Sequence, residues 1–300
     1  MLALATLLFI ALPAAAFAEA SQWQTSPSGR TIFVRFPEAP YPYSSRASGH
    51  VYEKKQYDVP SHYSDSTVAI FIPAGYVPTG GVDFIVHFHG WRNHVARALD
   101  YYQMREQVAD SRVNAVLVVP QGPYDAPDSD FGRLEHEPGA FAALLNHITA
   151  FLMQQHVLTS TSIKKITLSA HSGGYGGLSG VLALGGLPDS VTDVLLFDAA
   201  YGKLDGFSNW LAGARQRRLV TLFTDDTISG NVELLSMLQK RSVTNRVLMQ
   251  ADLTPEALQL RGATFIYTPD LPHDETMQKL HYYELFLRTA DLPTNAQLSP

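Results

Sequence analysis

The chain has 300 residues, of which 46% are hydrophobic and 17% are charged, and its formal net charge is −6. This composition supports a large apolar core, and the acidic balance lacks the basic footprint of a nucleic-acid-binding protein. There is no cysteine, which excludes disulfide bonds and a cysteine nucleophile.

Residues 1–18 have the pattern of a secretory signal peptide. An apolar run ends at Pro13, and Ala16-Phe17-Ala18 forms a small-x-small cleavage site before Glu19. The run is shorter than the roughly 20 residues that a membrane span needs. We therefore expect export to the periplasm or the medium after cleavage near Ala18, with no membrane span in the mature chain.

The rest of the chain divides into a short irregular part and a long regular part. Residues 19–66 are rich in Ser, Pro and Tyr, with one clear strand at 31–36, and are predicted to form an N-terminal layer packed on a main domain at 67–300. The predicted strands of that domain are 67–72, 82–88, 115–119, 163–169, 191–197, 219–223 and 264–267. The predicted helices are 94–109, 140–155, 176–184, 231–239 and 277–289.

This alternation of strands and helices predicts an α/β fold with a mainly parallel twisted sheet and helices on both faces. Several strands are continuous apolar runs, as expected when both faces of a strand are covered. Functional side chains should then collect just after the strands, at the carboxyl edge of the sheet.

Ser172 lies directly after the predicted strand 163–169, in the stretch Ala170-His-Ser-Gly-Gly174. Small residues two positions before and after the serine allow the backbone to turn sharply from strand to helix. This is the layout of a nucleophile elbow, with alanine in place of the usual first glycine.

Other polar residues also follow strands: His87 and His89, Asp198, the pair Asp225-Asp226, and His273. With a serine, then an acid, then a histidine in chain order, the chain resembles the α/β-hydrolase superfamily over about residues 67–290. A stretch Asp-Ala-x-Tyr-Gly, matched at Asp198–Gly202, resembles a group of exported bacterial hydrolases. The resemblance implies the α/β-hydrolase fold and a Ser-His-acid triad that works without a metal or other cofactor.

Ser172 is the predicted nucleophile and His273 the predicted base, because a loop histidine bounded by prolines can lie over the elbow and titrates near neutral pH. The acid has two candidates. The common placement in the superfamily favours Asp225 or Asp226, but a lone carboxylate at Asp198 in an apolar strand needs a buried partner such as a triad histidine. Asp198 is therefore the predicted acid and Asp226 the alternate.

The resemblance also implies an oxyanion hole made by the backbone N–H groups of Gly173 and Trp91. Four further residues are predicted to contact substrate, and these are His89, His171, Asp130 and Glu135. The two acids belong to a long acidic segment at 122–139, which is interpreted as a rim of the site. A solvated loop whose acids cap a helix is the alternative interpretation of that segment.

The sequence thus predicts an exported serine hydrolase that cleaves an ester or an amide through an acyl-enzyme, with esters favoured. Its substrate would be a small molecule or material of the cell envelope, handled by a carboxylesterase, an amidase or a peptidase. Two alternatives remain open at this point. One is a non-catalytic binding protein on the same fold, and the other is a metal-dependent hydrolase using His87 and His89.

Overall fold

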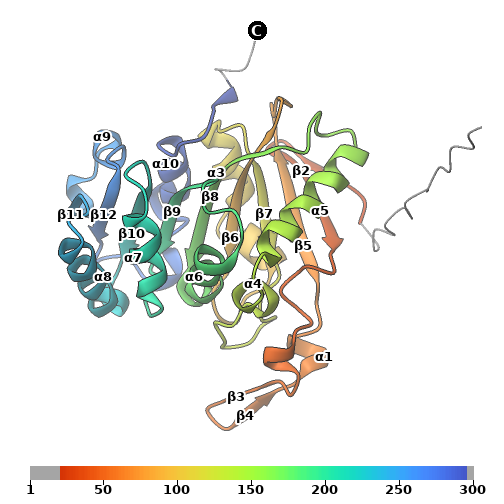
Figure 1. Ribbon diagram of the computed structural model, residues 1–300, viewed down its shortest axis with the longest axis horizontal. Helices are drawn as coiled ribbons and strands as arrows, with labels where there is room; N and C mark the ends of the chain where they lie inside the picture. The colour runs from red at the N-terminus through yellow and green to blue at the C-terminus, as the bar shows by residue number, and fades with distance from the viewer. Residues whose placement is uncertain (1–20, 296–300) are drawn as a thin grey trace, which may run out of the picture.

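The computed structural model describes residues 21–295, so the predicted signal peptide and its cleavage site lie outside the described residues. A central sheet of ten strands runs through this part of the chain in the order β1-β2-β5-β7-β6-β8-β9-β10-β12-β11 (Figure 1). Its strands are β1 (Gln24–Ser26), β2 (Gly29–Arg35), β5 (Thr67–Pro73), β6 (Val82–Phe88), β7 (Val116–Pro120), β8 (Ile163–His171), β9 (Val191–Phe197), β10 (Arg218–Phe223), β11 (Asn245–Met249) and β12 (Gly262–Tyr267). From β7 to β11 every neighbouring pair is parallel, while β1, β2 and β5 run antiparallel, so the mainly parallel sheet is confirmed.

Helices cover both faces of the sheet (Figure 1). On one face lie α4 (Gly132–His136), α5 (Ala140–Gln154), α6 (Tyr175–Leu184), α7 (Leu204–Ala212) and α8 (Ile228–Lys240), and on the other lie α2 (Val95–Tyr101), α3 (Met104–Ser111), α9 (Pro255–Leu258) and α10 (Tyr282–Arg288). Each face has its own apolar core, because successive side chains of a strand point to opposite sides.

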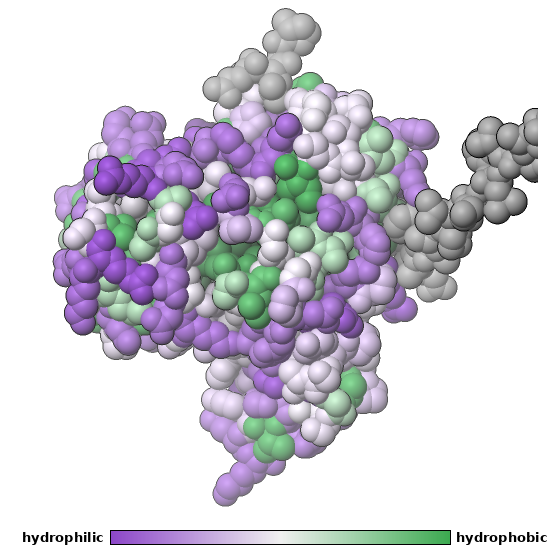
Figure 2. Space-filling model, in the orientation of Figure 1, coloured by the Kyte–Doolittle hydropathy of each residue, from purple (hydrophilic) through white to green (hydrophobic). Residues whose placement is uncertain are grey.

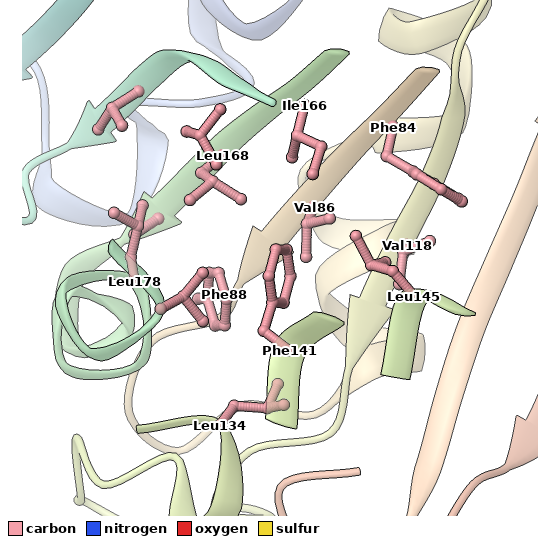
Figure 3. Close-up of a cluster of buried hydrophobic side chains, with 14 of the residues drawn as sticks. Phe84, Val86, Phe88, Val118, Leu134, Phe141, Leu145, Ile166, Leu168 and Leu178 are labelled. Atoms are coloured by element: carbon pink, nitrogen blue, oxygen red, sulfur yellow. The ribbon is translucent and has the colours of Figure 1, made fainter. Parts of the chain in front are cut away.

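Strand β6 illustrates how these cores form. Phe84, Val86 and Phe88 point into the core beneath α5 and α6, where Figure 3 shows Phe88 beside Phe141 and Leu178, while Ile85 belongs to the core of the opposite face. All seven residues of β6 are buried. A strand with two covered faces holds its carboxyl end rigidly, and that end carries the loop to the candidate site.

The N-terminal layer is partly built into the main sheet. Strand β2 pairs with β5 along its whole length, from Gly29 opposite Pro73 to Arg35 opposite Thr67, so residues 29–35 belong to the same sheet as the main domain. The following residues form an arm with a hairpin of β3 (His50–Tyr52) and β4 (Lys55–Tyr57) and the short helix α1 (Val59–His62). Figures 1 and 2 show the arm as a narrow projection from the body.

Two predicted helices differ from the structure for local reasons. The single helix expected at 94–109 is split into α2 and α3 by Gln103, whose φ is +49°. The helix expected from residue 277 begins only at Tyr282, because Leu280 and His281 also have positive φ. Strand β11 and helix α7 were not predicted; β11 is an edge strand of partly exposed residues whose apolar run is only three residues long. Within residues 21–295, no helix is both long and apolar enough to cross a membrane.

Candidate active site

Ser172 lies at the junction of β8 with a one-turn helix that leads into α6, and its backbone φ is +51°. A non-glycine residue rarely adopts this left-handed conformation, and such strain collects at functional sites. The loop after β6 presses against the turn, since a Cβ on Gly90 would lie 2.8 Å from Cβ of Ser172 and 3.1 Å from the carbonyl oxygen of His171. Glycine at position 90 therefore permits the close approach of the two loops.

Ser172 and His273 line the same cavity, which has a volume of about 750 Å³. Trp91, Ser129 and Gly173 contribute to the wall next to the serine. No hydrogen bond joins the Ser172 hydroxyl to His273 in the described part of the chain, but both side chains are partly exposed to the cavity. The cavity lies at the carboxyl ends of β6, β8 and β9, the edge of the sheet where the sequence predicted functional residues.

His273 is bound to a carboxylate behind it. Its Nδ1 lies 2.7 Å from Oδ2 of Asp198 and 3.8 Å from Oδ2 of Asp226. Asp198 is fully buried, with a φ of +47°, whereas the side chain of Asp226 is 59% exposed. Of the two candidate acids, Asp198 makes the hydrogen bond to the imidazole.

The carboxylate of Asp198 is held by three further donors. It accepts hydrogen bonds from the backbone N–H of Thr224 (3.1 Å), from the hydroxyl of Thr224 (2.5 Å) and from the hydroxyl of Thr227. Burial raises the pKa of Asp198, but the hydrogen bonds from His273 and the two threonines outweigh burial, so the pKa lies below its usual value. The acid is therefore ionised at neutral pH despite its apolar surroundings.

The hydrogen bond between Asp198 and His273 raises the pKa of the histidine, while it lowers the pKa of the aspartate. Burial lowers the pKa of His273, but the hydrogen bond and negative charge of Asp198 outweigh burial, so this pKa lies above its usual value. Because Nδ1–H points to Asp198, Nε2 is the nitrogen that can exchange a proton with a group in the cavity. An imidazole in this arrangement can take a proton and be stabilised as imidazolium.

His171 connects the elbow to the loop that carries His273. It is 2% exposed; its Nε2 donates to the backbone carbonyl of His273 (3.1 Å) and its Nδ1 accepts from the hydroxyl of Tyr102 (2.9 Å). Burial lowers its pKa to about 4, so the ring is neutral and both nitrogens are engaged. The structure therefore gives His171 a positioning contact with His273, and His171 also lines the cavity, so its predicted contact with substrate stays a prediction.

Trp91 and Gly173, the predicted oxyanion donors, lie side by side. A Cβ on Gly173 would overlap the Trp91 ring, so the indole lies directly over the start of the helix. The Trp91 Nε1–H donates to the hydroxyl of Ser129 (2.7 Å), while its backbone N–H has no acceptor among residues 21–295. Gly173 begins a helix, where N–H groups lack intrahelical acceptors. Neither backbone N–H is bound to an acceptor within residues 21–295, so the assignment of Gly173 and Trp91 as oxyanion donors stays a prediction.

His89 was predicted to contact substrate, and the structure contradicts this. It is 1% exposed, with Nδ1 donating to the carbonyl of Gly90 (2.9 Å) and Nε2 accepting from the backbone N–H of Gly122 (3.0 Å) and from Gln121 (3.1 Å). Burial lowers its pKa to about 4, so it stays neutral. His89 joins the two loops that follow β6 and β7 and does not line the cavity.

The acids of segment 122–139 also point away from the cavity, which corrects the predicted rim. Asp130 accepts from Tyr41 (2.8 Å), Ser45 (2.9 Å) and His136 (2.9 Å), and Glu135 binds Lys203 and the backbone N–H of Phe131 (3.0 Å). Asp130 is 8% exposed and Glu135 is 7% exposed. These acids anchor the N-terminal arm and α4; Ser129 is the residue of this segment that reaches the cavity.

His87 and His89 do not form a metal site within residues 21–295. His87 is fully buried with Nδ1 3.0 Å from the hydroxyl of Ser169, and within residues 21–295 no third ligand joins it and His89. Three other groups bring possible ligands together, and these are His171-His273-Asp274, Asp198-Asp226-His273 and Asp130-Glu135-His136. In the first two the shared residue is His273, whose Nδ1 is taken by Asp198, and in the third the acids are engaged by Lys203, Tyr41 and Arg46.

Several residues of the site were not predicted from the sequence. Thr224 and Thr227 flank the acidic doublet at 225–226, and both hydroxyls donate to Asp198. Two threonines on either side of a turn were the one pattern in the sequence that could have predicted a loop that binds a carboxylate. Tyr102 lies in what was predicted as one continuous helix, and Tyr52 comes from the distant arm. Their positions depend on tertiary contacts that no local pattern reveals.

No protein-family model matches the chain, and no curated protein matches it in sequence. Solved structures do resemble it. The feruloyl esterase module from Clostridium thermocellum, a serine-to-alanine mutant complexed with sinapinate, has a TM-score of 0.55 and 12% identity, with 92% of this chain and 96% of that chain covered. A structure named FAE has a TM-score of 0.55 and 12% identity, covering 95% and 98% of the two chains. The chain therefore has the α/β-hydrolase fold.

Proposed function

We propose that the protein is a serine hydrolase that cleaves a carboxylic ester through an acyl-enzyme. One observation carries the proposal: the strained elbow serine shares a cavity with a histidine whose Nδ1 lies 2.7 Å from a fully buried aspartate. A buried carboxylate, an imidazole and an exposed hydroxyl in this order are the parts that activate a serine.

In this mechanism the Ser172 oxygen attacks the carbonyl carbon of the substrate while Nε2 of His273 takes the hydroxyl proton. The backbone N–H groups of Gly173 and Trp91 donate to the developing oxyanion. His273 then returns the proton to the leaving group, and the acyl group stays on Ser172. Water, deprotonated by the same nitrogen, releases the acid and restores the serine.

Asp198 orients His273 through Nδ1 and stabilises the imidazolium as it forms. We assign this role to Asp198 and not to Asp226, because Asp226 is exposed and 1.1 Å farther from the ring nitrogen (3.8 against 2.7 Å). The threonines that bind Asp198 keep it ionised and fix the direction of its lone pairs.

Esters are the favoured substrates. One neighbour in fold is named a feruloyl esterase, and the cavity is open enough for a small substrate. Amide or peptide cleavage would use the same residues and stays the second candidate. The signal-like sequence at 1–18 supports an exported enzyme that acts in the periplasm or the medium on small or envelope-derived esters.

The test is hydrolysis of 4-nitrophenyl acetate by the purified protein. We expect Ser172→Ala to lower kcat by about 10⁶, the loss typical of removing a triad nucleophile. Ser229→Ala, which removes an exposed hydroxyl on α8, serves as the matched control and should match the parent protein. Activity that survives Ser172→Ala and is abolished by a chelator would replace this proposal with the metal-dependent alternative.

A further inference from the structure

Two cationic side chains line the cavity and take no part in the steps above. These are Arg92 and Arg97. Neither guanidinium forms an ion pair or donates a hydrogen bond within residues 21–295, whereas Arg46 and Arg218 are each bound to a carboxylate. The whole chain carries a net charge of −6, so unpaired positive charge at this cavity is opposite in sign to the net charge of the protein.

The backbone fixes where these arginines begin. Arg92 directly follows Trp91 and has a φ of +51°, and its N–H donates to the carbonyl of Ala126 (2.9 Å). Arg97 lies in the first turn of α2, where its N–H donates to His94 (3.3 Å). Both arginines therefore come from the loop and helix that follow β6, the segment that also carries Trp91 to the cavity wall.

The rest of the wall is strongly aromatic. Six aromatic side chains line the cavity, and these are Tyr52, Trp91, Tyr101, Tyr102, Tyr175 and Tyr201. Tyr52, from the β3–β4 hairpin, meets the Trp91 ring edge to face with centroids 5.3 Å apart. Ring faces and edges of this kind favour a flat aromatic group over a flexible alkyl chain.

One acid lines the same cavity, and it does not cancel both arginines. Asp274 follows His273 in the chain and forms no ion pair with Arg92 or Arg97. Two arginines against one aspartate leave this lining with a net charge of +1 when His273 is neutral. A carboxylate fits an arginine pair well because the planar guanidinium binds it through two parallel hydrogen bonds.

We propose that the substrate is an aromatic ester that carries a second, free carboxylate, with the ring held by the tyrosines and Trp91 and the carboxylate held by Arg92 and Arg97. This inference rests on the proposed function and adds the substrate class to it. The carboxylate is not the one released by hydrolysis; it is present on the substrate before Ser172 attacks.

The test compares two esters that share a leaving group, 4-nitrophenyl 4-carboxybenzoate and 4-nitrophenyl 4-carbamoylbenzoate. The value of kcat/KM for each is divided by its rate constant for hydroxide hydrolysis, which removes intrinsic reactivity. We expect the corrected ratio to favour the carboxylate by about 10- to 100-fold, the effect of a hydrogen bond between charged groups. The preference should shrink as salt is raised, because exposed charges are screened.

In the double variant Arg92→Gln/Arg97→Gln the ratio should fall to about one. The matched control Arg112→Gln/Arg241→Gln removes two exposed arginines elsewhere and should keep the parent ratio. If the parent protein hydrolyses both esters with a salt-independent ratio near one, the substrate inference is wrong and the serine hydrolase stands. If it hydrolyses neither ester nor 4-nitrophenyl acetate, the proposed function itself is contradicted.

Discussion

Two fully buried aspartates lie at β9, Asp193 within the strand and Asp198 directly after its last residue, and their partners differ. Asp193 binds Arg218, which is itself fully buried, with an Oδ1 to Nε distance of 2.5 Å. Asp198 binds His273, which is 24% exposed and opens onto the cavity. Both carboxylates accept several hydrogen bonds, so burial alone does not distinguish a structural acid from a functional one.

The difference lies in what the partner can do. Arg218 remains charged at any pH a protein tolerates, and it also donates to the carbonyls of Leu258 (2.8 Å) and Phe286 (3.1 Å), which joins β10 to the segments at α9 and α10. His273 can gain and lose a proton near neutral pH and reaches a solvent-filled space. The pair at Asp193 therefore fixes the fold, and the pair at Asp198 is equipped for proton transfer.

Of the changes that separate the two pairs, breaking the pair at Asp198 has the largest expected effect. Asp198→Asn keeps the size of the side chain but removes the charge that stabilises imidazolium, and we expect kcat/KM to fall by about 10⁴. Asp226→Asn is the matched control, because this exposed carboxylate lies 3.8 Å from the same nitrogen and should change the rate only slightly. Steady-state ester hydrolysis measures both. A large loss in Asp226→Asn with little loss in Asp198→Asn would reverse the assignment.

Breaking the other pair should affect stability and not chemistry. Arg218→Met leaves Asp193 buried without its main partner, which we expect to lower the free energy of unfolding by about 3–5 kcal/mol. Urea denaturation measures the change, and kcat per folded molecule should remain that of the parent protein. A variant of unchanged stability would show that Arg218 does not hold the fold.

The smallest expected effect is the dependence of kcat/KM on pH. Only neutral His273 can accept the serine proton, and its pKa lies above the ordinary value, so kcat/KM should fall on acidification with a midpoint above about 6.5. The fold binds the proton more tightly than the unfolded chain does. The stability that His273 contributes is thus complete below the unfolded pKa and is lost as pH rises through the folded pKa. A pH–rate profile with an acid limb below this value would contradict the assigned base.

The sequence predicted the parts of the fold that have local causes. Apolar runs such as β7 and β9 predicted buried strands, and the small residues around Ser172 predicted the elbow. The interpretation of Asp130 and Glu135 failed because their partners lie on the distant arm and on Lys203, which no pattern in segment 122–139 indicates. His89 was assigned to substrate for the same reason, since the groups of Gly90, Gln121 and Gly122 that engage its ring come together only in three dimensions.

The central claim is that the elbow serine is activated by the buried pair behind His273, and labelling with a fluorophosphonate tests it most directly. Such a probe reacts with a serine only when a base removes its proton. We predict that one probe molecule attaches to the peptide containing Ser172, with no labelling in Ser172→Ala and strongly slowed labelling in Asp198→Asn. Folded parent protein that resists the probe, or labelling that persists in Ser172→Ala, would contradict the account.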